Sequence, residues 1–301
     1  MSDRYAAHIG FVRPALRSPN LGSVLVVAVL MELIFILAPL FVRAMLPDRW
    51  LHLYETGVTP LGVLTQLLTF GLIAAALVWL VRKFHKRGFW SMVGPVDATM
   101  HNLKIAGLAV FVLLAAQAIL PPWVVFADLV EIRRLTSWAA WFIPAIFVLI
   151  IQTGTEELYF RGYLQQQCAA LSDKPWVWMG LPSVLFGAAH YLNGFGPADG
   201  MLYALWATLL GLACADLTAR TGNIGAAIGL HLSNNLFAFM IVGEKGMPSS
   251  GLALFLYPAT DHSQFDYGLH TLAEPWVIGE VIAIILTIGV MWLAARVALR
   301  R

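Results

Sequence analysis

Long apolar runs constrain this chain of 301 residues more than any other feature. Eight runs approach the roughly 20 residues that a helix needs to cross a ~30 Å hydrocarbon core. They are Leu21–Val42, Thr59–Val81, Ile105–Phe126, Trp138–Phe160, Trp176–Leu192, Met201–Leu217, Ile224–Val242 and Pro275–Ala295. Backbone polar groups in lipid must be satisfied within the segment, so each run predicts a helix and no sheet. The sequence therefore predicts an all-α, polytopic membrane protein with about eight transmembrane helices.

The composition agrees with this class and excludes others. Hydrophobic residues make up 59% of the chain and charged residues 12%, far below the charge content of soluble proteins. The net charge of +2 is small and the basic residues are scattered, so we expect no nucleic-acid partner. Cys168 and Cys214 have no metal or redox spacing. The first apolar run is too long for a signal peptide, so we expect it to be retained.

Lys and Arg residues divide unequally between the two sides that eight alternating helices would create. Of the 19, fourteen fall on the side of the N-terminus. The five on the other side are Arg43, Arg49, Arg133, Arg134 and Lys245. Basic residues accumulate in cytoplasmic loops, so this division predicts that both termini are cytoplasmic and that segment 243–274 is outside. We expect an integral protein of the cell (plasma) membrane, surrounded by the lipid bilayer.

A charged stretch, T-G-T-E-E-L-Y-F-R-G-Y-L-Q-Q-Q, follows the fourth apolar run at residues 153–167. Ionised groups at the end of a membrane segment are costly and need a compensating role. Glu157 and Arg161 are spaced i, i+4 on a helix and can pair on one face. Glu156 points about 100° away from that face. The pair is therefore interpreted as structural, which leaves Glu156 available for chemistry.

Two further polar constellations repeat the i, i+4 geometry. F-G-A-A-H places Phe186 and His190 on one helix face, and H-L-S-N-N places His231 and Asn235 on another. At ~1.5 Å per residue, Glu156 and His231 lie about 13 Å and 12 Å deep, but His190 lies about 21 Å deep. The three meet only if the fifth helix tilts or begins later than the apolar run suggests.

A carboxylate and two imidazoles in a dry cavity can activate water for attack on a carbonyl group. The single-helix zinc motif H-E-x-x-H is absent. Glu156, His190 and His231 would still supply three ligands for a divalent metal, zinc first, with an open position. A metal-free reaction would use the same residues. The structural alternative is a network of interhelical hydrogen bonds and a buried ion pair without chemistry.

Other polar residues are given structural roles. Glu32 and Glu280 have no spaced partner and are interpreted as packing or interhelical hydrogen-bonding residues. Asp216 and Arg220 are interpreted as a surface salt bridge. A solvated loop is favoured over a metal site for a set of four loop residues, because their spacing matches no ligand motif. These are Asp261, His262, Asp266 and His270.

The motifs resemble those of a known family. E-E-L-Y-F-R at 156–161, F-G-A-A-H at 186–190 and H-L-S-N-N at 231–235 are similar to the motifs E-E-x-x-x-R, F-x-x-x-H and H-x-x-x-N of the CPBP, or ABI, intramembrane proteases, which include CAAX prenyl protease 2. The resemblance implies an all-helical membrane fold, an active site that opens toward the cytoplasm, and endopeptidase activity. It divides the chain into an N-terminal part at 1–137, a catalytic core at 138–243, and an outer loop with a last helix at 244–301.

The resemblance also assigns roles by position. Glu156 would be the water-activating base, assisted by His190. His231 and Asn235 would stabilise the oxyanion, and Glu157 with Arg161 would hold the first motif in shape. The substrate would be a prenylated CAAX-type peptide, another small peptide, or a membrane protein. The alternative is a non-proteolytic membrane scaffold or an immunity or regulatory protein that uses the same polar network structurally.

Overall fold

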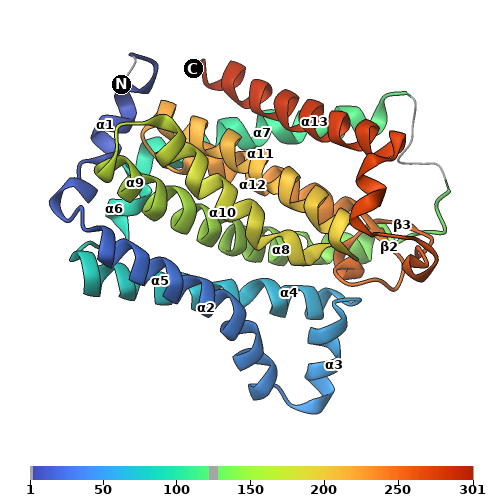
Figure 1. The fold of residues 1–301 in the computed structure, drawn as a ribbon. Helices are drawn as coiled ribbons and strands as arrows, with labels where there is room; N and C mark the ends of the chain where they lie inside the picture. Colours follow the sequence, from blue (N-terminus) through green and yellow to red (C-terminus); the bar gives the residue numbers. More distant parts are fainter. Residues whose placement is uncertain (1–2, 122–127, 301) are drawn as a thin grey trace.

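The structure is a computed structural model that describes residues 3–121 and 128–300, and it is almost entirely helical (Figure 1). The α-helices are α1 (Ala6–Val12), α2 (Leu21–Met45), α3 (Asp48–Thr56), α4 (Pro60–Leu68), α5 (Phe70–His85), α6 (Trp90–Val93), α7 (Val96–Ile119), α8 (Leu135–Glu157), α9 (Gln166–Leu171), α10 (Leu181–Ala189), α11 (Pro197–Thr221), α12 (Gly225–Leu236) and α13 (Pro275–Leu299). Wider π-helical turns occupy Leu158–Gln165, Trp176–Gly180 and Phe237–Ile241. Short 3₁₀ turns occupy Asp3–Tyr5, Ala15–Arg17, Tyr191–Asn193, Ser250–Leu252, His262–Gln264 and Leu269–Ala273.

The predicted class of all-α, polytopic membrane protein is confirmed. Six helical stretches of the described chain are long and apolar enough to span a membrane: Leu21–Met45, Pro60–His85, Val96–Ile119, Leu135–Leu171, Pro197–Thr221 and Pro275–Leu299. The predicted fifth and seventh helices are shorter, at 176–189 and Gly225–Ile241. The third begins earlier than predicted, at Val96, and residues 122–126 of its predicted range lie outside the described residues.

The two ends of the bundle differ in what they carry (Figure 1). Both chain termini lie at one end, and the β-strands lie at the other. Strands β1 (Glu131–Ile132), β3 (Phe255–Tyr257) and β2 (Val242–Glu244) form a small sheet in that order. The sequence predicted no sheet, which is wrong for this loop region. The bilayer argument holds only where no water can satisfy an open strand edge.

Helix α12 is packed directly against α7 through two glycines. A Cβ atom on Gly225 would lie 2.0 Å from the Thr99 carbonyl oxygen, and one on Gly229 would lie 2.4 Å from that of Leu103. Small residues spaced four apart allow membrane helices to approach this closely. The Ser233 hydroxyl adds a 2.7 Å bond to the Gly107 carbonyl across the same interface. These contacts fix the depth and rotation of α12, and therefore of His231.

A buried polar layer closes the bundle toward the termini. Every residue from Thr155 to Cys168 is buried. The Gln165 amide donates to His8 Nε2 at 3.3 Å, and the His8 ring lies 4.5 Å from Trp178. Burial lowers the pKa of His8 to about 4, so this imidazole is neutral at pH 7 and acts as an acceptor. The two glutamines that follow Gln165 bond Arg87 and His85 respectively.

Asp216 is a junction between three segments and not part of a surface salt bridge as predicted. Arg220 Nε lies 2.7 Å from its Oδ2 atom, as the spacing indicated. However, the Tyr5 hydroxyl donates to Oδ1 at 2.7 Å and Trp292 Nε1 donates to Oδ2 at 2.9 Å. Asp216 is buried, with 7% of its surface exposed. It therefore ties the N-terminal segment and α13 to α11, which the local spacing could not reveal.

Candidate active site

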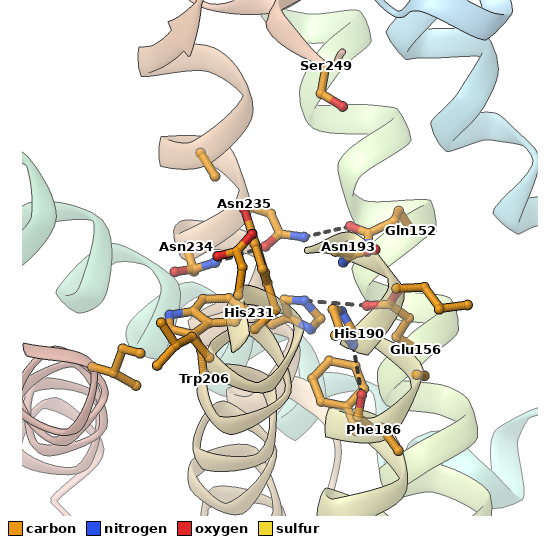
Figure 2. Close-up of a pocket in the computed structure, with 18 of the residues that line it drawn as sticks. Gln152, Glu156, Phe186, His190, Asn193, Trp206, His231, Asn234, Asn235 and Ser249 are labelled. Atoms are coloured by element: carbon orange, nitrogen blue, oxygen red, sulfur yellow. Dashed lines mark hydrogen bonds and ion pairs between the residues drawn. The ribbon is translucent and has the colours of Figure 1, made fainter. Parts of the chain in front are cut away.

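The three motifs lie around one cavity of about 1430 Å³. Its walls include residues of α2, α4, α5, α8, α10, α11, α12 and α13. Glu156, His190, His231 and Asn235 all line it, so the structure brings together every predicted catalytic residue (Figure 2). Phe186 lies between the histidines, with ring centroids 4.5 Å from His190 and 5.7 Å from His231.

His231 connects the two adjacent glutamates. Its Nδ1 atom lies 2.8 Å from Glu157 Oε1 and its Nε2 atom lies 3.4 Å from Glu156 Oε2. Glu157 also pairs with Arg161 at 3.2 Å, and both side chains are fully buried. A carboxylate held by a guanidinium only accepts hydrogen bonds, so His231 Nδ1 is the donor. His231 therefore presents Nε2 to Glu156, which is 6% exposed and faces the cavity.

His190 lies at the end of a helix and not within one. Helix α10 stops at Ala189, and a 3₁₀ turn of Tyr191–Asn193 follows. His190 Nδ1 donates to the Phe186 carbonyl oxygen at 2.7 Å, which leaves Nε2 of the neutral ring as an acceptor. The fifth helix begins at Trp176, as predicted, but ends before its apolar run does, and His190 lines the same cavity as the other two motifs.

Asn235 is held by two residues that the motifs did not include. Its Nδ2 atom donates to Gln152 Oε1 at 2.8 Å, and its Oδ1 atom accepts from Asn234 Nδ2 at 3.0 Å (Figure 2). One of the two Nδ2 hydrogens remains available for a ligand. Gln152 precedes Glu156 by four residues and shares its helix face, a signal from which the sequence could have identified it.

A π-helical segment, Leu158–Gln165, begins directly after the two glutamates. Such widened turns are rare and are often found at functional sites. The Arg161 guanidinium lies 4.9 Å from the centroid of the Phe186 ring, and Gly211 leaves room for it, since a Cβ there would lie 2.9 Å from Arg161 Nη2. The predicted Glu157–Arg161 pair is present and supports the floor of the cavity.

The two acidic residues interpreted as structural also line the cavity. Glu32 Oε1 accepts a 3.2 Å bond from the Tyr159 hydroxyl, in agreement with the predicted interhelical hydrogen bond. Glu280 has no hydrogen bond or ion pair within the described part of the chain. Their shared cavity was not visible in the sequence, because α2 and α13 are the first and last membrane helices.

The four loop residues considered for a metal site have separate local partners. Hydrogen bonds from Ser263 and Gln264 lower the pKa of the Asp261 carboxyl. His262 stacks on Phe195 at 3.4 Å, and His270 pairs with Asp266 at 3.0 Å. These local turn and capping contacts explain the positions of the four side chains.

The described residues do not form a ready-made metal site. No group of three or more His, Cys, Asp or Glu side chains among residues 3–121 and 128–300 is arranged to hold an ion. Glu156 and His231 are neighbours, and the Nδ1 bonds of His231 to Glu157 and of His190 to Phe186 are of the kind that metal-binding histidines make. The three side chains are not gathered around one point, however, so Glu156, His190 and His231 do not form the three-ligand set as they stand, and we derive no step through a metal.

The cavity reaches the surface at the end of the bundle opposite the termini. Leu192 and Phe265, which line it there, are 86% and 58% exposed. Toward the termini it is closed by the buried residues that follow Glu156. Cytoplasmic termini would place this opening on the outer face, whereas the resemblance implies an opening toward the cytoplasm, and both stay predictions.

Comparison with known proteins agrees with the motifs. Residues 137–237, which include all three motifs, match the family described as type II CAAX prenyl endopeptidase Rce1-like. This segment is similar to that family, and the resemblance drawn from the motifs is confirmed. The uncharacterized protein YyaK of Bacillus subtilis (strain 168) is 31% identical over 189 residues, 60% of this chain and 62% of that protein. The chain thus spans less than two thirds of this relative. No solved structure matches it significantly.

Proposed function

We propose that the chain is an intramembrane endopeptidase in which Glu156 activates water to hydrolyse a peptide bond. The observation that carries the proposal is the buried Glu156 carboxylate in the cavity, 3.4 Å from an imidazole whose other nitrogen is held by Glu157. An oriented imidazole beside a buried carboxylate is an arrangement that general acid–base chemistry requires. The substrate is a peptide or membrane protein, of which a prenylated CAAX-type sequence is one candidate, and no nucleic acid takes part.

In the proposed reaction, the water oxygen attacks the carbonyl carbon while Glu156 takes the water proton. Asn235 and His231 stabilise the charge that develops on the carbonyl oxygen, for which His231 carries a proton on Nε2 as well as on Nδ1, and His190 assists Glu156. The C–N bond then breaks, and the proton passes from Glu156 to the departing amine nitrogen. The products are a carboxylic acid and an amine, which become a carboxylate and an ammonium group by proton exchange.

The competing proposal is a non-proteolytic scaffold or immunity or regulatory protein with the same polar network. Hydrolysis of a quenched fluorescent peptide by the purified protein in detergent tests the two against each other. A scaffold would show no hydrolysis that depends on Glu156.

Asn235→Ala is expected to lower kcat by about 10²- to 10³-fold, the loss found when one oxyanion donor is removed. Gln152→Ala should lower kcat less, because it removes only the residue that orients the Asn235 amide. Both rates are measured in the peptide assay, with thermal unfolding as the control for folding. Hydrolysis by Asn235→Ala at the wild-type rate would refute its role at the oxyanion.

Orientation in the membrane is tested by cysteine labelling. We propose cytoplasmic termini, from the distribution of Lys and Arg, and hence a cavity mouth on the outer face. An impermeant maleimide on intact cells should label exposed Ser263→Cys, and Asp173→Cys only after permeabilisation. The native Cys168 and Cys214 are buried, so the background is low. The reverse pattern would place the mouth at the cytoplasm.

A further inference from the structure

Carboxylates dominate the charge of the cavity wall. The described lining residues include no Lys or Arg. The five acidic residues among them are Glu32, Glu156, Asp199, Asp266 and Glu280. Negative charge on a low-dielectric wall raises the local concentration of cations and repels anions.

Two of these carboxylates are satisfied by their own loops. Asp266 pairs with His270 at 3.0 Å. Asp199 accepts a 2.9 Å hydrogen bond from the backbone N–H of Phe195. These contacts explain why both residues are present without a ligand.

Glu32 and Glu280 lack a comparable explanation. Glu32 lies near the middle of α2, a membrane helix, and its partner is the neutral Tyr159 hydroxyl. Glu280 lies in the second turn of α13, is exposed, and has no ion pair within the described residues. Carboxylates in membrane helices are costly and usually mark a pathway or a site for a charged partner.

Glu156 independently points to a ligand in the same space. It is more than nine-tenths buried, and its Oε2 atom has the 3.4 Å contact with His231 Nε2 but no hydrogen bond from the described residues. Aromatic side chains also line the cavity, among them Phe35, Trp206 and Trp276. Aromatic faces bind both apolar groups and cations. The cavity thus combines an apolar surface with carboxylates that have no Lys or Arg partner among the described residues.

We infer that the cavity selects an apolar peptide segment that carries a Lys or Arg side chain, with Glu32 and Glu280 as the residues that recognise its positive charge. This inference rests on the proposed endopeptidase function and specifies its substrate class. The same carboxylates would repel a free C-terminal carboxylate, so the structure favours an internal basic segment over a CAAX terminus.

Three quenched peptides that differ at one position, with Lys, norleucine or Glu there, test the inference. Norleucine keeps most of the lysine side chain but lacks the charge. We expect kcat/KM for the Lys peptide to exceed that for norleucine by about tenfold or more, the order set by one hydrogen bond to a charged group. The Glu peptide should be the poorest substrate. Equal kcat/KM for all three would overturn the inference.

Variants then locate the preference. Glu32→Gln and Glu280→Gln should each lower the Lys preference several-fold, and the double variant should remove it. Glu32→Gln can still accept from Tyr159, so folding should be retained. Glu274→Gln, exposed and outside the cavity lining, makes the same change in net charge and should leave the preference intact. An unchanged preference in the double variant would refute the assignment.

Binding separates this inference from the proposed function. Fluorescence anisotropy with the three labelled peptides and Glu156→Gln requires no hydrolysis. Tighter binding of the Lys peptide that is lost in the Glu32→Gln/Glu280→Gln double variant would support the inference. This result would hold even if no peptide were cleaved. In that case only the endopeptidase proposal would fail. Equal binding of all three peptides would overturn the inference alone.

Discussion

Glu156→Gln is expected to remove nearly all hydrolysis, with kcat lowered by about 10²- to 10⁴-fold, the usual contribution of a general base. Glutamine keeps the shape of the side chain and can still meet His231, but it cannot take a proton from water. Because Glu156 borders the cavity and Glu157 holds the buried ion pair, folding should be unaffected. The measurement is peptide hydrolysis by purified protein in detergent, with thermal unfolding measured alongside.

Two comparisons make this experiment decisive. The Glu156→Gln protein, purified identically, reports any contaminating protease, and cleavage at the wild-type rate would exclude Glu156 as the base. A chelator separates the two chemistries proposed for the same residues. If a metal such as zinc assists, chelation should reproduce the Glu156→Gln loss and added zinc should reverse it. If the reaction is metal-free, chelation should leave the rate unchanged.

Arg161→Ala is expected to destabilise the fold by ~3–5 kcal/mol, because removal of one partner leaves the other charge buried and unpaired. Arg161 and Glu157 are both 0% exposed, and the guanidinium also packs against Phe186. The alanine variant would lose the ion pair and leave a void beneath the cavity. Thermal unfolding in detergent and the folded yield measure the effect.

Arg220→Ala is the matched control, since Arg220 also pairs with an acidic residue four positions earlier. Asp216 keeps its bonds from Tyr5 and Trp292 and its pair is partly exposed, so the loss should be clearly smaller. A melting temperature for Arg161→Ala equal to that of the wild type would show that the Glu157 pair contributes nothing to stability.

Sequence spacing alone was sufficient to predict ion pairs in which both residues lie on the same helix. The Glu157–Arg161 pair and the Asp216–Arg220 pair form as i, i+4 geometry requires. The apolar runs were sufficient to predict an all-helical fold, because a backbone in lipid must form its hydrogen bonds within the segment. They did not fix helix ends: the fifth run is helical only to Ala189, since its apolar residues continue into a turn.

The sequence by itself determined the membrane class, the approximate helices and the three motifs, because each depends on neighbours along the chain. Only the tertiary structure decided that His231 connects Glu157 to Glu156, that Gln152 orients Asn235, and that α2 and α13 add carboxylates to one cavity. These relations join residues separated by whole helices. Helix rotation and depth, set by contacts such as Gly225 and Gly229 against α7, decide which side chains meet, and no local pattern encodes them.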